Sequence, residues 1–464
     1  MPQAGPICGA IFKPLIVESM SKVNCSYDRG IFEQAVASAN HQGRPLYILV
    51  LATKPCYIKL ASLVYSLRKQ SLPFLLVDAG QHYQPNLTHA RDELAYRELI
   101  GVYLNIRGSL LGRTADLAHK IEWLVNKLRT IGLRELPLPI VSGDTSTAGL
   151  WPLLWYLLTG LRSIHVEAGL RSWGPQISWE WQGLKQLISQ RDCKWTRFRE
   201  DPFPEGIETA AASVASDLFF APVERNVANL VNEGYASEKI HVVGSLSSDA
   251  VSLALMLDSR RTERMTTPDL SIGKWLRVDI HRRENTTPER LQAILQGIGK
   301  FSEDGGKVLL IRTNALDAAL EQRGESNVVQ TLETQSGVMV QGLWPSYLDV
   351  ISFINSENCL GVFTDSGGLQ EEADVLGVPC VTCRYSTDRP ETVLDSCSNL
   401  LLAPESPQFI RKGLDSVFSS DRSEVWPAHG NENLYSENVA ERIVAILSEY
   451  EPPAPAKGAE IEFR

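Results

Sequence analysis

The sequence predicts an α/β protein of two doubly wound, Rossmann-like parallel-sheet domains that face each other across an interdomain cleft. Three observations support this prediction. The 464 residues suffice for two ordinary domains. Short, continuous apolar runs recur along the chain, as expected of parallel strands that are covered on both faces. Helical stretches lie between most of these runs, and this alternation is typical of right-handed crossover connections.

The first predicted domain covers residues 46–250 and begins where a regular pattern starts. Helical stretches at 58–70 and 113–128 separate some of its strands. We expect these strands at 46–51, 74–77, 138–141, 163–166, 218–220 and 241–243. Residues 1–45 show no clear period and end in a turn-rich segment, so we expect them to form an N-terminal extension.

The second predicted domain covers residues 251–430, after a connection somewhere between 245 and 270. We expect its strands at 276–280, 308–311, 338–340, 360–363, 379–382 and 399–402. A C-terminal helix is predicted over 431–450, and the proline-rich tail at 451–464 is predicted to be disordered. Doubly wound sheets bind ligands beyond the carboxyl ends of their strands, so a site is expected in the loops there.

Composition and charge exclude several classes of protein. A net charge of −10 with no basic stripe argues against a nucleic-acid partner. No apolar run approaches the ~18 residues of a membrane span, and no signal peptide is evident. Eight scattered cysteines are typical of a reduced, cytoplasmic protein. Cys380 and Cys383 lie three apart on a predicted strand, where their side chains point to opposite faces, so we expect no metal site.

The clearest candidate for ligand binding is the segment that follows the predicted strand at 360–363. It contains Asp365, Ser366, Gly367 and Gly368, and a helix begins directly after it. Glycines let the backbone approach an anion, and the free amides of a helix N-terminus point toward it. Glu372, farther along the helix, could accept from ribose hydroxyls. An ordinary Ser-capped helix is the structural alternative.

Charged side chains also follow other predicted strands. Asp144 follows the strand at 138–141, and Glu167 follows the strand at 163–166. Taken alone, either carboxylate is also consistent with a helix cap or a surface salt bridge. The strand at 276–280 ends in His281, Arg282 and Arg283. A single histidine is usually structural, but guanidinium groups at this edge favour a clamp for a diphosphate.

Together these segments resemble the non-hydrolysing UDP-N-acetylglucosamine 2-epimerase family. The matching motifs occur in the family's order over residues 46 to about 450: Gly143-Asp144-Thr145, His165 to Arg171, Pro204-Glu205, Gly244, Asp249, His281 to Glu284, Asp365 to Glu372, and Thr387 to Glu391. The resemblance implies an isomerase of GT-B fold that needs no cofactor. It also implies a UDP-sugar substrate and a homodimer, with UDP held mainly by the second domain.

The resemblance further implies roles for single residues. The family eliminates UDP to form a 2-acetamidoglucal and then adds UDP back. Asp144, Glu167 and Glu205 match its proton-transfer carboxylates, and His281 matches the histidine that assists UDP departure. Ser366 and Glu372 match phosphate and ribose contacts. The full predicted substrate-binding set is Lys54, Lys59, His165, Arg171, Arg282, Ser366, Gly367, Gly368, Glu372 and Arg389.

The sequence departs from the family pattern in several places, among them Ile280, which stands where the family has glycine before the His-Arg-Arg-Glu block. Lys54 stands where the family has arginine, which keeps the charge but loses the forked geometry. After Glu205 the family continues with a second glutamate and ends in Asn-Arg, whereas this chain continues with Gly206 and has no arginine there; Arg197 or Arg199 could replace it. An insertion at about 173–200 holds four of the ten tryptophans. It fits a lid, a partner surface or a small subdomain that packs its own aromatic side chains.

Three other functions stay open at this point. A hydrolysing relative would release free ManNAc and UDP, and loss of the arginine could let the glucal escape to water. A GT-B glycosyltransferase could use the Trp-rich insertion as an acceptor site, although a transferase needs only one base. A sugar-nucleotide sensor would bind UDP-GlcNAc without turnover.

Overall fold

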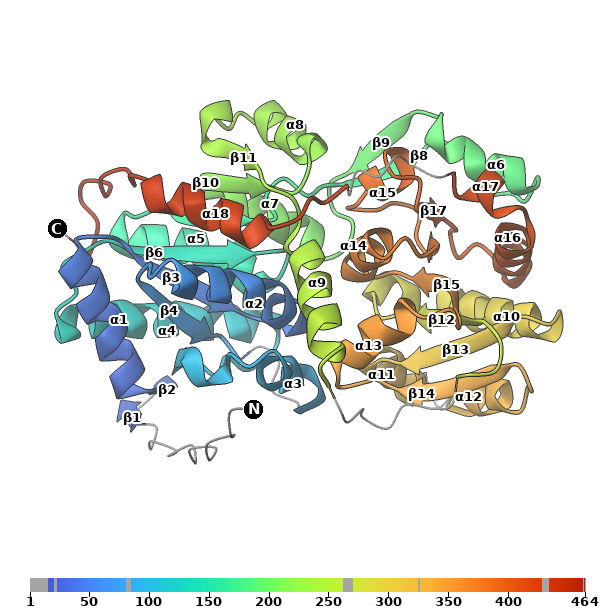
Figure 1. The fold of residues 1–464 in the computed structure, drawn as a ribbon, viewed down its shortest axis with the longest axis horizontal. Coiled ribbons are helices and arrows are strands. Elements are labelled where there is room, and N and C mark those ends of the chain that lie inside the picture. Colours follow the sequence, from blue (N-terminus) through green and yellow to red (C-terminus); the bar gives the residue numbers. More distant parts are fainter. Residues whose placement is uncertain are drawn as a thin grey trace, which may run out of the picture.

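The computed structural model describes residues 16–20, 23–80, 85–261, 270–323, 326–427, 434–461 and 463. It confirms the predicted fold class: two α/β domains, each with helices on both sides of a mainly parallel sheet, lie side by side (Figure 1). None of the helices in these ranges combines the length and hydropathy that a membrane span requires.

The first domain is built on a nine-stranded sheet in which β2 runs antiparallel to its neighbours β1 and β5 and all other neighbouring strands are parallel. In sheet order the strands are β1 (Ile16–Met20), β2 (Val23–Tyr27), β5 (Ile100–Tyr103), β4 (Phe74–Asp78), β3 (Leu46–Leu51), β6 (Pro137–Ser142), β7 (Ser163–Val166), β10 (Ser216–Ala221) and β11 (Ile240–Val242). Its helices are α1 (Arg29–Gln42), α2 (Lys54–Lys69), α3 (Pro85–Glu93), α4 (Leu110–Ile131), α5 (Ser146–Thr159), α7 (Glu205–Val214) and α8 (Glu224–Asn232).

The first domain begins earlier than the predicted boundary at residue 46. Strand β2 pairs with β5, and α1 buries Phe32 and Val36 in the core of this domain. Asp28 caps the start of α1 by accepting from the Ile31 amide at 3.0 Å, and Gly43 ends it at a φ of 60°. The described residues before Leu46 are therefore part of the domain. Helix α1 was missed although its buried residues Phe32, Ala35, Val36 and Ala39 recur at the helical spacing i, i+3, i+4 and i+7.

The second domain is built on a six-stranded sheet that is parallel throughout. In sheet order its strands are β14 (Val338–Gly342), β13 (Lys307–Arg312), β12 (Trp275–Asp279), β15 (Cys359–Thr364), β16 (Cys380–Thr382) and β17 (Asn399–Leu401). Its helices are α10 (Pro288–Glu303), α11 (Asn314–Arg323), α12 (Ser326–Glu333), α13 (Tyr347–Ile354), α14 (Gly367–Val375), α15 (Glu391–Leu394), α16 (Pro407–Ser419) and α17 (Arg422–Val425).

Two helices connect the domains. Helix α9 (Leu246–Asp258) leads from the first domain toward the second, within the predicted connection. Helix α18 (Val439–Glu449) returns and lies against the first domain (Figure 1). Its buried face contributes Ile443 and Leu447 to the same core cluster as α2, and the Tyr47 hydroxyl donates to the Leu447 carbonyl at 2.7 Å.

The tail after α18 is packed on the first domain, so the prediction of disorder is wrong for the residues that the structure describes. Ile461 and Phe463 are buried in the core cluster that contains α4 and α5. The Ala456 amide donates to the Gly160 carbonyl at 2.9 Å, and the Ile461 amide donates to Leu158 at 3.0 Å. The proline-rich composition indicated disorder, but the apolar side chains at the end of the tail find a complementary surface that local composition does not reveal.

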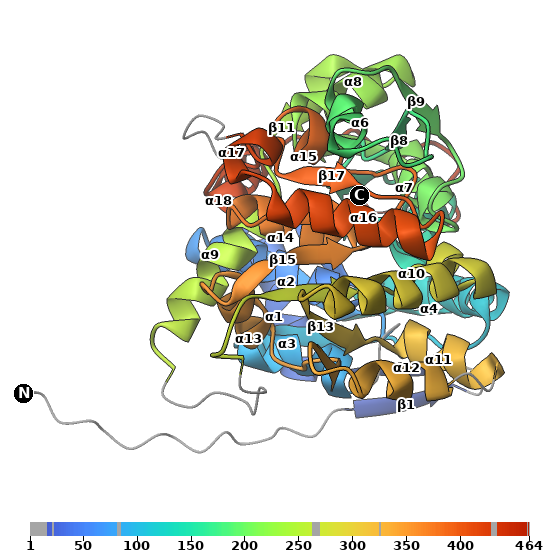
Figure 2. The same ribbon diagram turned by 90° about the vertical axis from the view of Figure 1, so that its right-hand side faces the viewer.

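The Trp-rich insertion leaves the first domain and packs on the second; we call residues 172–198 the strap. Antiparallel strands β8 (Ser172–Pro175) and β9 (Trp195–Phe198) form its stem, and α6 (Leu184–Ile188) lies near its tip. In both views α6 lies beside α16 of the second domain (Figures 1 and 2). Trp179 and Trp181 contact Phe409 of α16, with ring centroids 6.3 and 6.0 Å apart. These tryptophans therefore pack on the second domain rather than on one another.

The tip of the strap also caps the edge of the second sheet. The Gln190 side chain donates to the Leu401 carbonyl at 3.2 Å and accepts from the Leu401 amide at 2.7 Å, as a neighbouring strand would. Arg191 donates to the carbonyls of Cys397 and Val425 at 2.9 and 2.7 Å. Leu187 is 1% exposed within the core of the second domain. The strap is thus an integral part of that core.

We expect Leu187→Ala to lower the free energy of unfolding by about 2–4 kcal/mol, because it removes a buried apolar side chain from the core of the second domain. Lys185→Ala, on the exposed side of α6, should change it by less than ~0.5 kcal/mol. Urea denaturation measures both variants. A loss below about 1 kcal/mol for Leu187→Ala would show that the strap contributes little to the core.

Candidate active site

Two of the predicted carboxylates follow neighbouring strands of the first sheet. Asp144 follows β6 and Glu167 follows β7, and these strands pair through Val141–His165 and Ser142–Val166. Glu167 is 4% exposed and has a φ of 61°, a left-handed conformation that is unusual for a residue other than glycine. Such outliers concentrate at functional sites, where surrounding contacts hold them. The Ser142 hydroxyl donates to Glu167 at 3.3 Å.

Glu167 belongs to a buried charge network that joins the two domains. The ammonium group of Lys59, on α2, contacts the carboxylate of Glu167 and lies 2.9 Å from that of Glu371, on α14. Glu371 also accepts from the Arg389 guanidinium. Ser245 and Ser247 donate to Glu371 as well. The structure therefore brings together Lys59, Glu167 and Arg389 of the predicted set.

The two carboxylates of this network have different proton affinities. Burial would raise the pKa of Glu371, but Arg389 and Lys59 outweigh burial and lower it to about 2. Burial raises the pKa of Glu167, although Lys59 opposes that rise. Glu371 therefore stays ionised, and of the two it is Glu167 that is suited to exchange a proton.

The loop that carries His281 and Arg282 is organised by Asp365. This buried carboxylate accepts from the backbone amides of His281 and Arg282 at 3.0 Å each, and from the Asn285 side chain at 3.0 Å. The His281 ring nitrogen Nδ1 lies 3.2 Å from Asp365, and its side chain is 38% exposed. Asp365 thus holds the histidine at the carboxyl end of β12 while one side of the ring stays accessible.

Arg282 of the second domain lies beside the other two carboxylates, which belong to the first domain. Its guanidinium nitrogens lie 3.2 Å from Glu205 and 3.7 Å from Asp144. Burial raises the pKa of Glu205, and Arg282 partly offsets that rise. The Glu205 Oε2 atom is buried and accepts no hydrogen bond from the described residues. One basic oxygen of Glu205 is therefore unused within the described part of the site.

The turn before α14 lies at the carboxyl end of β15. Ser366 caps the helix by accepting from the Leu369 amide at 3.4 Å. A Cβ at Gly367 would lie 3.3 Å from a carboxylate oxygen of Asp388, so this position favours glycine. At Gly368 the nearest described atom to a built Cβ is 3.9 Å away, which leaves this side of the turn open. Helix amides at such a turn favour a phosphate.

Glu372 and Lys54 lie together near Trp344. The Lys54 ammonium donates to the Trp344 carbonyl at 3.1 Å. Burial lowers the pKa of Lys54 to about 8, and burial raises the pKa of Glu372 to about 7 despite the opposing charge of Lys59. Both groups can therefore change protonation close to neutral pH.

Two members of the predicted set have partners inside the first domain. The His165 ring lies 3.0 Å from the Ser213 hydroxyl, and burial together with Arg171 lowers its pKa to about 3, so the ring is neutral. The Nε and Nη2 atoms of Arg171 donate to the two carboxylate oxygens of Glu233 at 2.8 and 2.6 Å. Arg197, considered as a replacement for the missing arginine, donates to Glu233 as well.

The sequence did not single out Glu208, which lies in the first turn of α7 with Glu205. The Ser146 hydroxyl donates to Glu208. Burial raises the pKa of Glu208 to about 7; Glu205 and Asp144 add to that rise, and Ser146 and Arg283 oppose it. The three-residue spacing from Glu205, which puts both side chains on one face of a helix, was the available signal.

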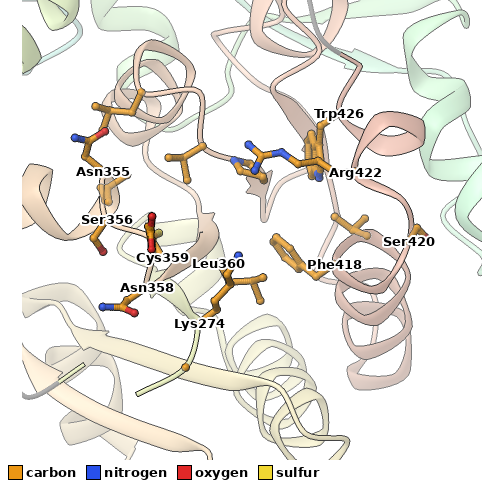
Figure 3. A pocket seen from close by; sticks show the side chains of 17 residues that line it. Lys274, Asn355, Ser356, Asn358, Cys359, Leu360, Phe418, Ser420, Arg422 and Trp426 are labelled. Carbon is orange, nitrogen blue, oxygen red and sulfur yellow. The ribbon is translucent and has the colours of Figure 1, made fainter. Parts of the chain in front are cut away.

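A separate cavity of about 640 Å³ lies at the opposite edge of the second sheet. Lys274, Cys359, Phe418 and Trp426 line it, beside the amino ends of β12 and β15 (Figure 3). It contains none of the predicted site residues. Parallel sheets bind ligands at their carboxyl ends, so the residues around His281 and Asp365 are the better candidate.

Comparisons with known proteins found similar sequences and similar folds. Residues 197–448 match the family model described as UDP-N-acetylglucosamine 2-epimerase. The UDP-N-acetylglucosamine 2-epimerase of Methanococcus maripaludis is 28% identical over 409 residues, which cover 86% of this chain and 97% of that relative. The UDP-2,3-diacetamido-2,3-dideoxy-D-glucuronate 2-epimerase of Pseudomonas aeruginosa is 27% identical over 75% of this chain and 85% of its own length. The structure of UDP-GlcNAc 2-epimerase from Methanocaldococcus jannaschii, in complex with UDP-GlcNAc and UDP, matches with a TM-score of 0.70 and 26% identity. The match covers 87% of this chain and 100% of that one.

We expect Glu208→Gln to change how stability depends on pH. The folded-state pKa of Glu208 lies above its ordinary value, so its contribution to stability is present at low pH and is lost as pH rises through about 7. Glutamine resembles the protonated acid at every pH. The melting temperature of the variant should therefore rise relative to the unmodified chain between pH 5 and pH 8. An equal difference at both pH values would contradict the assignment.

Proposed function

This chain belongs to the UDP-N-acetylglucosamine 2-epimerase family, whose members are isomerases, and we propose that it interconverts UDP-GlcNAc and UDP-ManNAc. The observation that supports the proposal is that three carboxylates of the first domain lie beside cations close to the boundary with the second domain. Asp144 and Glu205 flank Arg282, and Glu167 contacts Lys59. A transferase would need only one such base, whereas inversion at C2 needs proton exchange on both faces of the sugar.

The proposed reaction is an elimination followed by re-addition. A carboxylate takes the C2 proton, the C1=C2 double bond forms, and the C1–O bond breaks with its electron pair passing to the β-phosphate of UDP. The resulting 2-acetamidoglucal then receives a proton at C2 from the opposite face, while UDP attacks C1. The unused Oε2 oxygen of Glu205 and the raised proton affinity of Glu167 suit them to these two transfers.

The second domain would hold the UDP moiety. The turn at Ser366, Gly367 and Gly368 presents helix amides to the diphosphate, and Arg282 supplies positive charge beside it. His281, accessible on one side, would stabilise the departing phosphate. Glu372 would accept from the ribose hydroxyls, and Lys54 would add a cation on that side. His165 and Arg171 would support the first domain from within.

A hydrolysing outcome is the second candidate function. Thr209, which is buried, stands where the family has arginine, and Glu208 adds a carboxylate beside Glu205 and Asp144. Loss of the arginine makes the sugar side of the site more negative, and Glu208 adds to this charge as it ionises near pH 7. The added charge would weaken the hold on the departing UDP and let water reach the glucal. Free ManNAc in the products would favour this outcome.

We further infer a cytoplasmic homodimer. The described cysteines are free thiols, as in a reducing compartment. Helices α5 and α7 pack together and expose apolar side chains, and α5 has no charged residue. The apolar side chains on and beside these helices are Leu153, Leu157, Phe203, Ile207 and Val214, exposed by 43% to 62%. A second copy would cover such a face through a two-fold contact.

The decisive test is an NMR time course with UDP-GlcNAc in deuterated buffer. We expect UDP-ManNAc to form with deuterium at C2 in both sugars, because the transferred proton exchanges with solvent. Glu205→Gln should lower kcat at least about 100-fold with little change in UDP affinity, because it removes one of the two proton-transfer groups, whereas Glu33→Gln, in a surface ion pair with Arg29, should change neither. Unchanged UDP-GlcNAc despite a thermal shift on binding would indicate a sensor instead.

For the dimer, we expect Leu157→Glu to yield a monomer in analytical ultracentrifugation, because it places a charge in the apolar face of α5 and α7. Leu111→Glu, at an 81% exposed position on α4, is the control and should leave the dimer intact. A dimeric Leu157→Glu variant, or an unmodified chain that sediments as a monomer, would show that this face does not form the interface.

A further inference from the structure

A short segment leads from the end of the strap to Glu205, the carboxylate that faces Arg282. After β9 the chain runs through Asp201 and Pro202 and enters α7 at Glu205. The Gly206 amide donates to the Pro202 carbonyl at 2.6 Å. The position of Glu205 therefore depends directly on how this returning segment is held.

Gly206 shows how closely the returning segment packs on α7. A Cβ at this position would lie 2.8 Å from the Asp201 carbonyl oxygen and 3.0 Å from its carbonyl carbon, both of which are backbone atoms. Any side chain would therefore displace Asp201. The family has glutamate here. The glycine accompanies the insertion because only glycine leaves room for the segment that returns from it.

Asp201 joins this segment to the second domain. Its carboxylate accepts from the Ser386 hydroxyl and lies 3.6 Å from the Arg384 guanidinium. At the start of the strap, Trp173 and Thr387 exchange two backbone hydrogen bonds of 2.8 Å each. The start of the strap and the segment that follows it therefore both attach to residues 384–387, shortly before Arg389 of the network that contains Glu167.

Together with the anchors at Leu187 and Gln190, these contacts fix the strap at its tip and at its stem. Glu205 belongs to the first domain, but its nearest supporting segment is bound to the second. We propose that the strap positions Glu205 for proton transfer, with Asp201 as the positioning residue that couples Glu205 to the second domain. This inference rests on the proposed function.

The test is a double-mutant cycle between Asp201→Ala and Glu205→Gln, with kcat measured by NMR and UDP affinity by calorimetry. We expect Asp201→Ala to lower kcat about tenfold or more, with KM and UDP affinity within about twofold. Asp201→Asn, which keeps an acceptor for Ser386, should recover part of the loss. In the Glu205→Gln background, Asp201→Ala should cause no further loss, because the residue that it positions no longer functions.

Two variants keep the test valid if Asp201→Ala fails to fold or Glu205→Gln is too slow to measure. Ser386→Ala removes the same hydrogen bond from the second domain, and Gly206→Ala displaces the Asp201 backbone, so both should lower kcat similarly. The matched control is Glu180→Ala, which changes an exposed residue of the strap and should leave kcat unchanged.

Independent, multiplying losses in the cycle would overturn the inference, as would values of kcat within twofold for Ser386→Ala and Gly206→Ala. An unmodified chain that does not convert UDP-GlcNAc would instead refute the proposed function. Active unmodified protein with unaffected variants would refute only the positioning role.

Discussion

The arrangement of the two domains depends on the buried ammonium group of Lys59, which contacts one carboxylate from each of them. Glu167 follows a strand of the first sheet, and Glu371 lies on the first helix after β15 of the second. A charge removed from water is tolerated only when it is paired, so separating the domains would leave these groups without partners or return them to solvent. Arg389 completes the balance by pairing with Glu371. The same contacts that join the domains thus set the protonation of the site.

This network explains how carboxylates of one type can serve different purposes. Glu371 accepts from two cations and two hydroxyl groups, which keeps it ionised and makes it a structural anion. Glu167 is buried and accepts from one cation, Lys59, and from the Ser142 hydroxyl, and Glu205 has one oxygen without a hydrogen bond among the described residues. Environments that push proton affinities apart are how a fold assigns acid and base roles. The left-handed backbone at Glu167 keeps its side chain in this network.

The strap adds contacts between the two domains. It is inserted in the first domain, yet Leu187 lies in the core of the second and Gln190 covers the edge of β17. Local physical chemistry accounts for both contacts, since an apolar side chain needs a core and an edge strand needs hydrogen-bond partners. As a result, Asp201, in the segment that leads into Glu205, contacts Ser386 and Arg384 of the second domain.

Sequence alone determined the elements whose signals are local. Apolar runs predicted the parallel strands of both sheets from β3 onward except β5, and the Ser366 turn and the carboxylates after β6 and β7 were predicted at the edge where they lie. The tertiary structure decided the rest, because side-chain direction and docking depend on residues far apart in the chain. It showed that His165 and Arg171 have partners within the first domain, that the tail is packed, and that the insertion belongs to the second core. It also revealed Glu208, since a raised proton affinity arises only where burial and neighbouring charges converge.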